Sequence, residues 1–216
     1  MGKYHTVLFD MDGTILDTLD DLTDSVNHTL RRLGFSERTR EEVRTYLGYG
    51  SRYLMEMALG TSETAAVDEA FRIYRAWYGA HTQIKTKPYD GIADVMRALR
   101  AHGIRVAVAS NKPEATVKKL CEYHFPALVD ASVGDVDGRE RKPQRDMIDA
   151  VLAELGASRS GAVYVGDTEV DVQTAQNADL PVIAVGWGFR SKEQQAEAGA
   201  TVFADTPEEL LRLLTE

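Results

Sequence analysis

Hydrophobic residues follow two different periods along the chain. Thr6-Val7-Leu8-Phe9 is a short apolar run with a β-branched residue, which predicts a buried strand that ends at Asp10. From about Leu19 to Ala80, apolar residues recur every three or four positions, which predicts helices without a convincing strand. The first of these helical stripes contains Leu19, Leu22, Val26, Leu30 and Leu33.

Local signals divide the helical stretch into four helices. Gly34 is suited to end the first helix, and Thr39-Arg-Glu-Glu resembles a capping box at the start of the second. A glycine-rich break at residues 48–52 precedes a third helix that runs to Gly60. Ser62 is the expected cap of the last helix. Placed after a single strand, this segment reads as a separate small helical bundle.

From Pro88 onward, helices and apolar strands alternate. This alternation predicts a parallel sheet covered by helices on both faces. The expected fold class is therefore α/β, a doubly wound, Rossmann-like parallel sheet with an inserted all-helical domain. We expect the core to comprise residues 1–16 and 84–216 and the insert residues 17–83. Helices are expected at 92–100, 114–123, 143–155, 170–178, 192–198 and 207–214, and strands at 104–109, 128–133, 162–165, 181–185 and 201–203.

Composition narrows the functional classes. The chain has 216 residues and a net charge of −9 without a basic run, so nucleic-acid binding has little support. No stretch approaches ~18 consecutive apolar residues and no secretory signal is visible, so no membrane association is expected. Cys121 is the only cysteine, which excludes an intrachain disulfide and fits a reducing, cytoplasmic location.

Polar residues cluster where the predicted strands end. Asp10 and Asp12 follow the first strand, Ser110 and Asn111 follow the strand at 104–109, and Gly166-Asp167 with Asp171 follow the strand at 162–165. Carboxyl ends of parallel strands share one edge of the sheet, where open α/β folds bind their ligands. We therefore expect these side chains to converge on one crevice.

The carboxylates in this group suggest a metal and a nucleophile. Asp10 and Asp167, with a backbone carbonyl, offer the oxygen ligands that Mg²⁺ prefers, and no Cys or His cluster suggests zinc. Strand alternation places Asp10 and Asp12 on one side, with Met11 pointing away. One carboxylate can then attack while the other transfers protons. Taken alone, Asp-x-Asp-Gly could also be a turn or part of a calcium loop.

Cations and hydroxyl groups complete the candidate site. Ser110 could donate a hydrogen bond to a phosphoryl oxygen, and Lys142 could neutralise both Asp10 and the phosphoryl charge. Arg52 and Arg190 each follow a glycine-rich bend and are candidates for gripping a small carboxylate with two parallel bonds. Thr14, Asn111 and Gly50 are further candidates for substrate binding.

These motifs resemble those of the haloacid dehalogenase-like hydrolase superfamily. Asp10-Met-Asp12-Gly-Thr14 is similar to its nucleophile loop, Val108-Ala-Ser110-Asn to its second motif, Lys142-Pro143 to its third and Gly166-Asp167-Thr-Glu-Val-Asp171 to its fourth. The resemblance covers essentially the whole chain, and the helical insert corresponds to the cap of that family.

The resemblance implies a division of roles. Asp10 would be the nucleophile, Asp12 the general acid and base, and Ser110 and Lys142 would bind the phosphoryl group. Magnesium would be held by Asp10, the Asp12 carbonyl and Asp167, with Asp171 supporting it directly or through water. The dehalogenase branch lacks the second aspartate of the first motif, so Asp12 implies a phosphatase.

Within the superfamily the chain is most similar to phosphoglycolate phosphatases. That similarity lies in Leu47-Gly-Tyr-Gly50, Pro88-Tyr-x-Gly91 and Gly186-Trp-Gly-Phe-Arg190. The expected activity is Mg²⁺-dependent hydrolysis of a small phosphorylated metabolite, with 2-phosphoglycolate first, by a monomer or homodimer. An inorganic pyrophosphatase, a β-phosphoglucomutase-like phosphosugar mutase and a non-catalytic phosphate-binding regulatory module are the alternatives. The cap is expected to open and close about hinges near residues 17–18 and 82–87.

Overall fold

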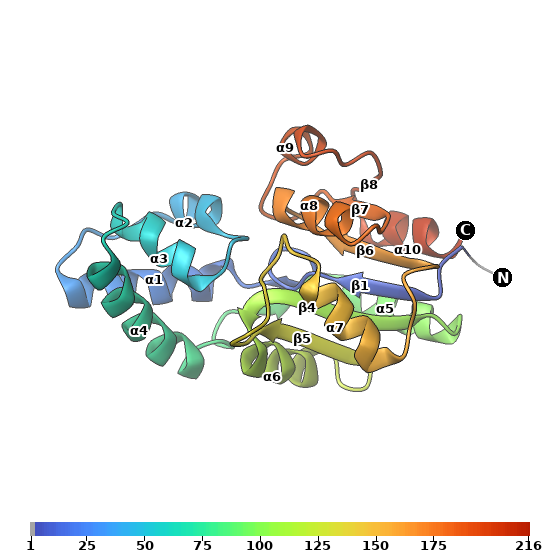
Figure 1. Ribbon diagram of the computed structural model, residues 1–216, viewed down its shortest axis with the longest axis horizontal. Helices are drawn as coiled ribbons and strands as arrows, with labels where there is room; N and C mark the ends of the chain where they lie inside the picture. The colour runs from blue at the N-terminus through green and yellow to red at the C-terminus, as the bar shows by residue number, and fades with distance from the viewer. Residues whose placement is uncertain (1–2) are drawn as a thin grey trace.

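A central six-stranded sheet forms the core of the computed structural model, which describes residues 3–216 (Figure 1). Every pair of neighbouring strands is parallel, and the strand order is β5-β4-β1-β6-β7-β8. The predicted α/β class with a parallel sheet is confirmed. The strands are β1 (Thr6–Phe9), β4 (Arg105–Pro113), β5 (Ala131–Asp135), β6 (Ala162–Gly166), β7 (Val182–Val185) and β8 (Phe203–Ala204).

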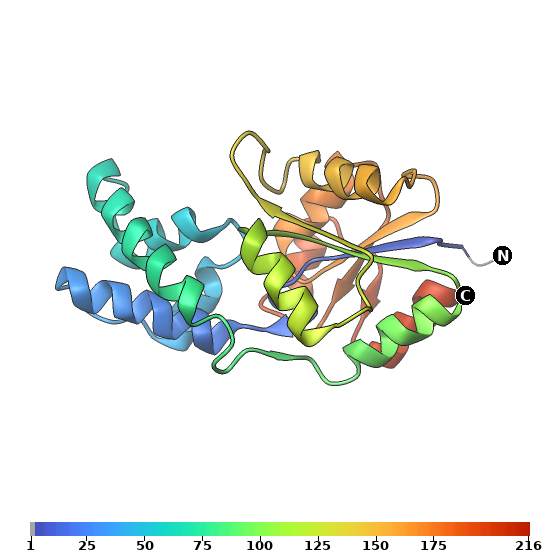
Figure 2. The same ribbon diagram turned by 90° about the horizontal axis from the view of Figure 1, so that it is seen from below.

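Helices cover both faces of this sheet (Figure 2). On one face lie α5 (Ile92–Ala101), α6 (Glu114–His124) and α10 (Pro207–Thr215), and on the other lie α7 (Asp146–Leu155) and α8 (Glu169–Asn177). The short helix α9 (Lys192–Glu197) contacts α8. This double cover explains why the strands read as continuous apolar runs.

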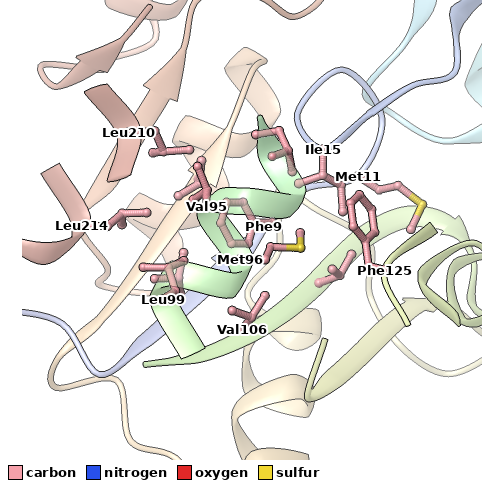
Figure 3. Packing of buried hydrophobic residues seen from close by; sticks show 14 of the residues in the cluster. Phe9, Met11, Ile15, Val95, Met96, Leu99, Val106, Phe125, Leu210 and Leu214 are labelled. Carbon is pink, nitrogen blue, oxygen red and sulfur yellow. The ribbon is translucent and has the colours of Figure 1, made fainter. Parts of the chain in front are cut away.

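Alternation along β1 distributes its side chains between the two faces. Phe9 packs with α5 and α10 residues on one face, in the cluster that also contains Met11 and Ile15 (Figure 3). Leu8 points to the opposite face, toward Met147 and the other apolar residues of α7. Met11, predicted to point away from Asp10 and Asp12, is buried in this cluster, which leaves the flanking carboxylates free to face the sheet edge.

Four helices between β1 and the rest of the core form a cap, which lies at the opposite end of the molecule from the termini (Figure 1). They are α1 (Leu19–Leu33), α2 (Arg40–Tyr46), α3 (Ser51–Leu59) and α4 (Thr64–Ala80). They pack around a hydrophobic cluster that is separate from those of the core and that Phe189 joins from the core. In the described part of the chain, none of the helices has the length and apolar character needed to cross a membrane.

The predicted helix ends of the cap are mostly confirmed. Gly34 takes the left-handed conformation at the end of α1, with φ of 78°, and Thr39 forms the expected capping box with Glu42. The prediction for Ser62 is wrong, because α4 is capped one residue later by the Glu63 side chain, which accepts a hydrogen bond from the Ala66 N–H.

Some core elements differ in extent from the prediction. The strand expected at 104–109 continues as β4 to Pro113, so residues 110–112 belong to the strand itself. Helix α7 begins at Asp146 instead of residue 143, because residues after Lys142 first form a turn in which the Gln144 N–H donates to the Arg141 carbonyl. The motif containing Lys142 therefore lies on a loop.

Two short strands join the cap to the core. β2 (Leu16–Asp17) pairs antiparallel with β3 (Lys87–Pro88), so both crossing segments run side by side. Asp21 at the start of α1 fixes the returning segment, since its buried carboxylate accepts hydrogen bonds from the Ile84, Lys85 and Thr86 N–H groups and from the Thr86 hydroxyl, at 2.7–3.0 Å. The predicted domain boundaries and hinges fall at this junction and remain predictions.

Replacing Asp21 with alanine should destabilise the protein by about 2 kcal/mol or more, because buried backbone donors would lose their acceptor. The free energy of unfolding in urea measures this effect. Asp24→Ala is the matched control, because Asp24 is an exposed residue of the same helix whose carboxylate pairs with Lys85. Exposed ion pairs contribute little, so this change should lower stability much less. Equal losses in the two variants would contradict the role assigned to Asp21.

Candidate active site

Three buried carboxylates meet at the carboxyl edge of the sheet. Asp10 follows β1, Asp167 follows β6, and Asp171 lies in the first turn of α8. One carboxylate oxygen from each lies within 4.8 Å of the others. β1 and β6 are neighbouring parallel strands, so their ends coincide in space. The sequence prediction that these acids converge is thus matched by the geometry.

Lys142 joins two of these acids. Its Nζ lies 2.6 Å from Asp10 Oδ1 and 2.8 Å from Asp171 Oδ1, and it also donates to the Tyr164 hydroxyl at 3.0 Å. Burial alone would lower the pKa of the Lys142 ammonium, but the Asp10 and Asp171 carboxylates outweigh it and hold that pKa well above its usual value. Lys142 is therefore a permanent positive charge within the acidic cluster.

The single positive charge of Lys142 does not neutralise the three buried carboxylates. Burial raises the pKa of Asp10 to about 7, opposed by Lys142 and reinforced by the nearby Asp171 and Asp12 carboxylates. Burial, followed by Asp171 and Asp10, also raises the pKa of Asp167 well above its usual range. Such acids ionise readily only beside further positive charge.

A hard divalent cation fits this donor set. The three side-chain candidates offer carboxylate oxygens, which Mg²⁺ prefers, and these are already grouped within 4.8 Å. A cation would supply the charge that Asp10 and Asp167 lack. The donors at Asp10, Asp167 and Asp171 thus suit the predicted metal.

Neighbouring groups hold the two acids of the fourth motif. Asp167 accepts hydrogen bonds from the Thr14 hydroxyl at 2.9 Å and from the Phe189 N–H at 2.6 Å. Asp171 accepts from the Thr168 N–H and hydroxyl at 3.0 and 2.7 Å, at the start of α8. Thr14 therefore orients an acid of the cluster, and its hydroxyl is directed at Asp167.

The second carboxylate of the first motif has a separate environment. Asp12 accepts a hydrogen bond from the Thr18 hydroxyl at 2.6 Å, and its Oδ1 lies 3.1 Å from the ammonium nitrogen of Lys112. Its side chain is about one-fifth exposed, whereas Asp10 is almost fully buried. The two acids thus differ in partners and in access to the pocket.

A pocket between cap and core collects most of the predicted site residues. From the core it is lined by Asp10, Asp12, Ser110, Asn111, Lys112, Lys142 and Thr168. From the cap it is lined by Leu22, Leu47, Gly48, Gly50, Ser51, Leu54 and Tyr74. The cap closes the opening above the acids, so both parts of the chain define what enters.

The second motif ties the walls of this pocket together. The Asn111 side chain donates to the carbonyls of Gly48 and Lys142 at 3.0 Å and accepts from the Lys142 N–H at 2.9 Å. Ser110 accepts a hydrogen bond from the Lys112 N–H, which leaves its own hydroxyl hydrogen available to a ligand. Gly50 lies against the Asn111 backbone, where a Cβ would come within 3.4 Å of the carbonyl oxygen.

The two arginines predicted to bind a carboxylate lie elsewhere. Arg52 pairs with Asp68 on the cap and does not line the pocket. Arg190 is buried, pairs with Glu169 at 2.8 Å, and donates to cap carbonyls including that of Leu47 at 2.8 Å. Their substrate-binding roles remain predictions, and the observed contacts make Arg190 a tie between core and cap.

Sequence reasoning missed four residues that shape the site. Lys112 directly follows the second motif, and a charged residue among strand-end polar groups could have marked it. Tyr164 was read as part of an apolar strand, although its hydroxyl donates to the Ala109 carbonyl at 3.1 Å and contacts Lys142. Tyr74 and Tyr78 have the four-residue spacing of core positions on a helix, and both pack in the cap cluster, so no sequence signal sets their hydroxyl groups apart.

Comparison with known proteins gives a consistent result. The family profile described as haloacid dehalogenase-like hydrolase matches residues 7–185. Proteins named phosphoglycolate phosphatase from Aquifex aeolicus and Rhodospirillum rubrum are each 32% identical to this chain. The former aligns over 85% of both chains, and the latter over 92% of this chain and 86% of its own.

Solved structures agree with the sequence comparison. A crystal structure of a proposed phosphoglycolate phosphatase from Lactobacillus delbrueckii subsp. bulgaricus has a TM-score of 0.92 and 37% identity, covering 100% of this chain and 99% of its own. CbbY from Rhodobacter sphaeroides, solved in complex with phosphate, has a TM-score of 0.76 and 26% identity over 96% of each chain.

The loop that carries Lys142 is anchored at its base by Glu114, the first residue of α6. Glu114 accepts a hydrogen bond from Arg139 at 2.6 Å and another from Lys118 at 2.9 Å. Burial would raise the pKa of Glu114, but these hydrogen bonds outweigh it and lower the pKa to about 2. The ionised form therefore stabilises the folded loop.

Glu114→Gln should lower stability at pH 7. Because the folded pKa is depressed, the advantage of the wild type is complete above the ordinary value of 4.5 and is lost as the pH falls toward 2. Urea midpoints of both proteins, measured from pH 7 down to pH 2, test this dependence. Glu122→Gln, on an exposed part of the same helix, is the control, and a wild-type advantage that persists unchanged to pH 2 would contradict the assignment.

Proposed function

The chain belongs to the haloacid dehalogenase-like hydrolases, and from that premise we propose that it is a Mg²⁺-dependent phosphatase of small phosphorylated metabolites, with 2-phosphoglycolate as the favoured substrate. The observation that carries this proposal is the buried Asp10–Lys142–Asp171 cluster, which opens on a pocket that also contains Asp12. Phosphatase relatives at about 30% identity support the reaction class.

Asp10 is the proposed nucleophile. Its carboxylate oxygen would form a bond to phosphorus while the bond from phosphorus to the leaving oxygen breaks, which gives an aspartyl phosphate. Asp12 would donate a proton to the leaving oxygen and then accept one from water. That water would attack phosphorus, break its bond to Asp10 and release inorganic phosphate.

Positive charge and donors favour this transfer. Ser110 and Lys142 would contact the phosphoryl oxygens, where fixed positive charge stabilises the transition state. Mg²⁺, when held by the carboxylates of Asp10 and Asp167 and the carbonyl of Asp12, supplies further charge, and Asp171 would support it directly or through water. Burial beneath the cap limits the access of competing water to the reacting group.

The substrate assignment rests on size, charge and relatives. The pocket is enclosed by cap and core, and two lysines line it, which suits a small anion. The relatives from Aquifex aeolicus and Rhodospirillum rubrum carry the name phosphoglycolate phosphatase. Cytoplasmic location and a monomeric or homodimeric state are also proposed, and the single, free cysteine supports the former.

Asp10→Asn should lower kcat for an aryl phosphate by about 10³-fold or more, because the amide cannot form the acyl phosphate. Steady-state phosphate release with Mg²⁺ measures this. Removing the cation with a chelator should abolish activity, and added Mg²⁺ should restore it. Asp20→Asn, an exposed aspartate on the cap that pairs with Arg40, is the matched control.

Full activity in Asp10→Asn would overturn the mechanism. A panel of 2-phosphoglycolate, pyrophosphate and β-glucose 1-phosphate, compared by kcat/KM, decides the substrate class. The highest value is expected for 2-phosphoglycolate. Isomerised sugar phosphate without free phosphate would instead identify a mutase, and pyrophosphate as the best substrate would identify a pyrophosphatase.

A further inference from the structure

The two buried lysines of the pocket differ in how many of their donors the protein uses. An ammonium group has three N–H donors. Lys142 has three partners, Asp10, Asp171 and Tyr164, at 2.6–3.0 Å. Lys112 has two partners among residues 3–216, Asp12 and the Tyr78 hydroxyl. Lys112 therefore keeps one donor for a ligand.

Lys112 lines the pocket, so a ligand bound there could accept a hydrogen bond from its unused donor. Its side chain is 3% exposed to solvent, and it lines the pocket beside Asp12. The ring of Tyr78 covers it, with Nζ 4.5 Å from the ring centroid. A lysine this buried is normally fully paired, so an unused donor on a lysine that lines a pocket indicates an anionic ligand.

A second unused donor comes from the cap. Tyr74 on α4 is 1% exposed and lines the same pocket. Its hydroxyl makes no hydrogen bond of normal geometry within the described part of the chain, although the Ser51 side chain lies close enough to oppose the rise that burial causes in the pKa of Tyr74. Tyr74 lies one helical turn before Tyr78, and the two rings stack with centroids 5.4 Å apart. Buried hydroxyl groups are usually hydrogen-bonded, so this one also calls for a ligand.

We propose that Lys112 and Tyr74 form a subsite that binds the carboxylate of the substrate while Asp10 attacks its phosphoryl group. This inference rests on the proposed phosphatase function and names the residues that select its substrate. One ammonium N–H and one phenol O–H match the two oxygens of a carboxylate, whereas a second phosphoryl group presents three oxygens and more charge.

The subsite spans both parts of the chain. Lys112 is the last residue but one of β4 in the core, and Tyr74 lies on α4 of the cap. A substrate with a carboxylate would gain both contacts only with the cap seated on the core. Arg52, the cap arginine that the sequence suggested for a carboxylate, is already paired with Asp68 and does not line the pocket.

The test compares 2-phosphoglycolate with its amide, 2-phosphoglycolamide, which has the same number of non-hydrogen atoms and lacks the carboxylate charge. Dissociation constants are measured by calorimetry with Mg²⁺ in the Asp10→Asn background, where turnover does not intervene. Lys112→Met should weaken binding of 2-phosphoglycolate about 10- to 100-fold, as for a lost hydrogen bond to a charged group. Binding of the amide should change less than about threefold, because the neutral ligand lacks that charge-assisted bond.

Two further variants complete the comparison. Tyr74→Phe removes one oxygen and should also weaken 2-phosphoglycolate selectively, and it decides the question if Lys112→Met fails to fold. Lys119→Met, at an exposed position on α6, should leave both ligands unaffected.

Equal weakening of both ligands by Lys112→Met and by Tyr74→Phe would overturn the proposal, since Lys112 would then act only through Asp12. Selective weakening of 2-phosphoglycolate binding by Arg52→Met, and not by Lys112→Met, would assign the carboxylate to Arg52. Loss of pyrophosphate binding in Lys112→Met without loss of 2-phosphoglycolate binding would assign a phosphoryl group to the subsite. An inactive wild-type protein would refute the proposed function, but the binding ratio would still decide the subsite.

Discussion

The contact of the Lys142 ammonium with Asp10 and Asp171 is the interaction on which the site depends. Lys142 and Asp10 are 132 positions apart in sequence, so only the complete sheet can bring them together. Two buried carboxylates this close would repel each other strongly, and a single cation between them makes the arrangement possible. Even so, burial keeps the pKa of Asp10 near 7. The cluster therefore carries more negative charge than Lys142 neutralises, which favours binding of a divalent cation. The bound cation and the pocket lysines would in turn favour an anionic substrate.

A few side chains of the core connect it to the cap. Asn111 bonds to the Gly48 carbonyl of the cap and to the backbone of Lys142, so one side chain links the substrate entrance with the reacting centre. Arg190 adds bonds to cap carbonyls from the loop after β7. The cap is therefore held by these polar contacts, by the paired strands β2 and β3, and by Phe189 of the core, which packs in the hydrophobic cluster of the cap. The polar contacts exchange with water at little net cost, which is compatible with a cap that opens to admit substrate.

The first motif shows how far sequence reasoning reaches. An apolar strand that breaks at Asp10 and Asp12 predicts a sheet edge with exposed chemistry, and the alternating elements after Pro88 predict which strand ends share that edge. Arg52 shows the limit, because its partner Asp68 lies 16 residues away on another helix and local spacing carries no record of such pairing. For Lys112 and Tyr74, the sequence likewise does not show that a buried donor lacks a partner. A buried tyrosine has the same helical spacing whether or not its hydroxyl finds a partner, so only the packed structure shows which donors remain unused.

The central claim is that phosphoryl transfer proceeds through Asp10 in two displacements, and the stereochemical course at phosphorus tests it most directly. Hydrolysis of a phosphate ester made chiral with oxygen isotopes, in water of the third isotope, yields chiral inorganic phosphate. Each in-line displacement inverts the configuration at phosphorus. Two displacements, first by Asp10 and then by water, therefore predict overall retention. Overall inversion would show that water attacks the substrate directly and would contradict the account.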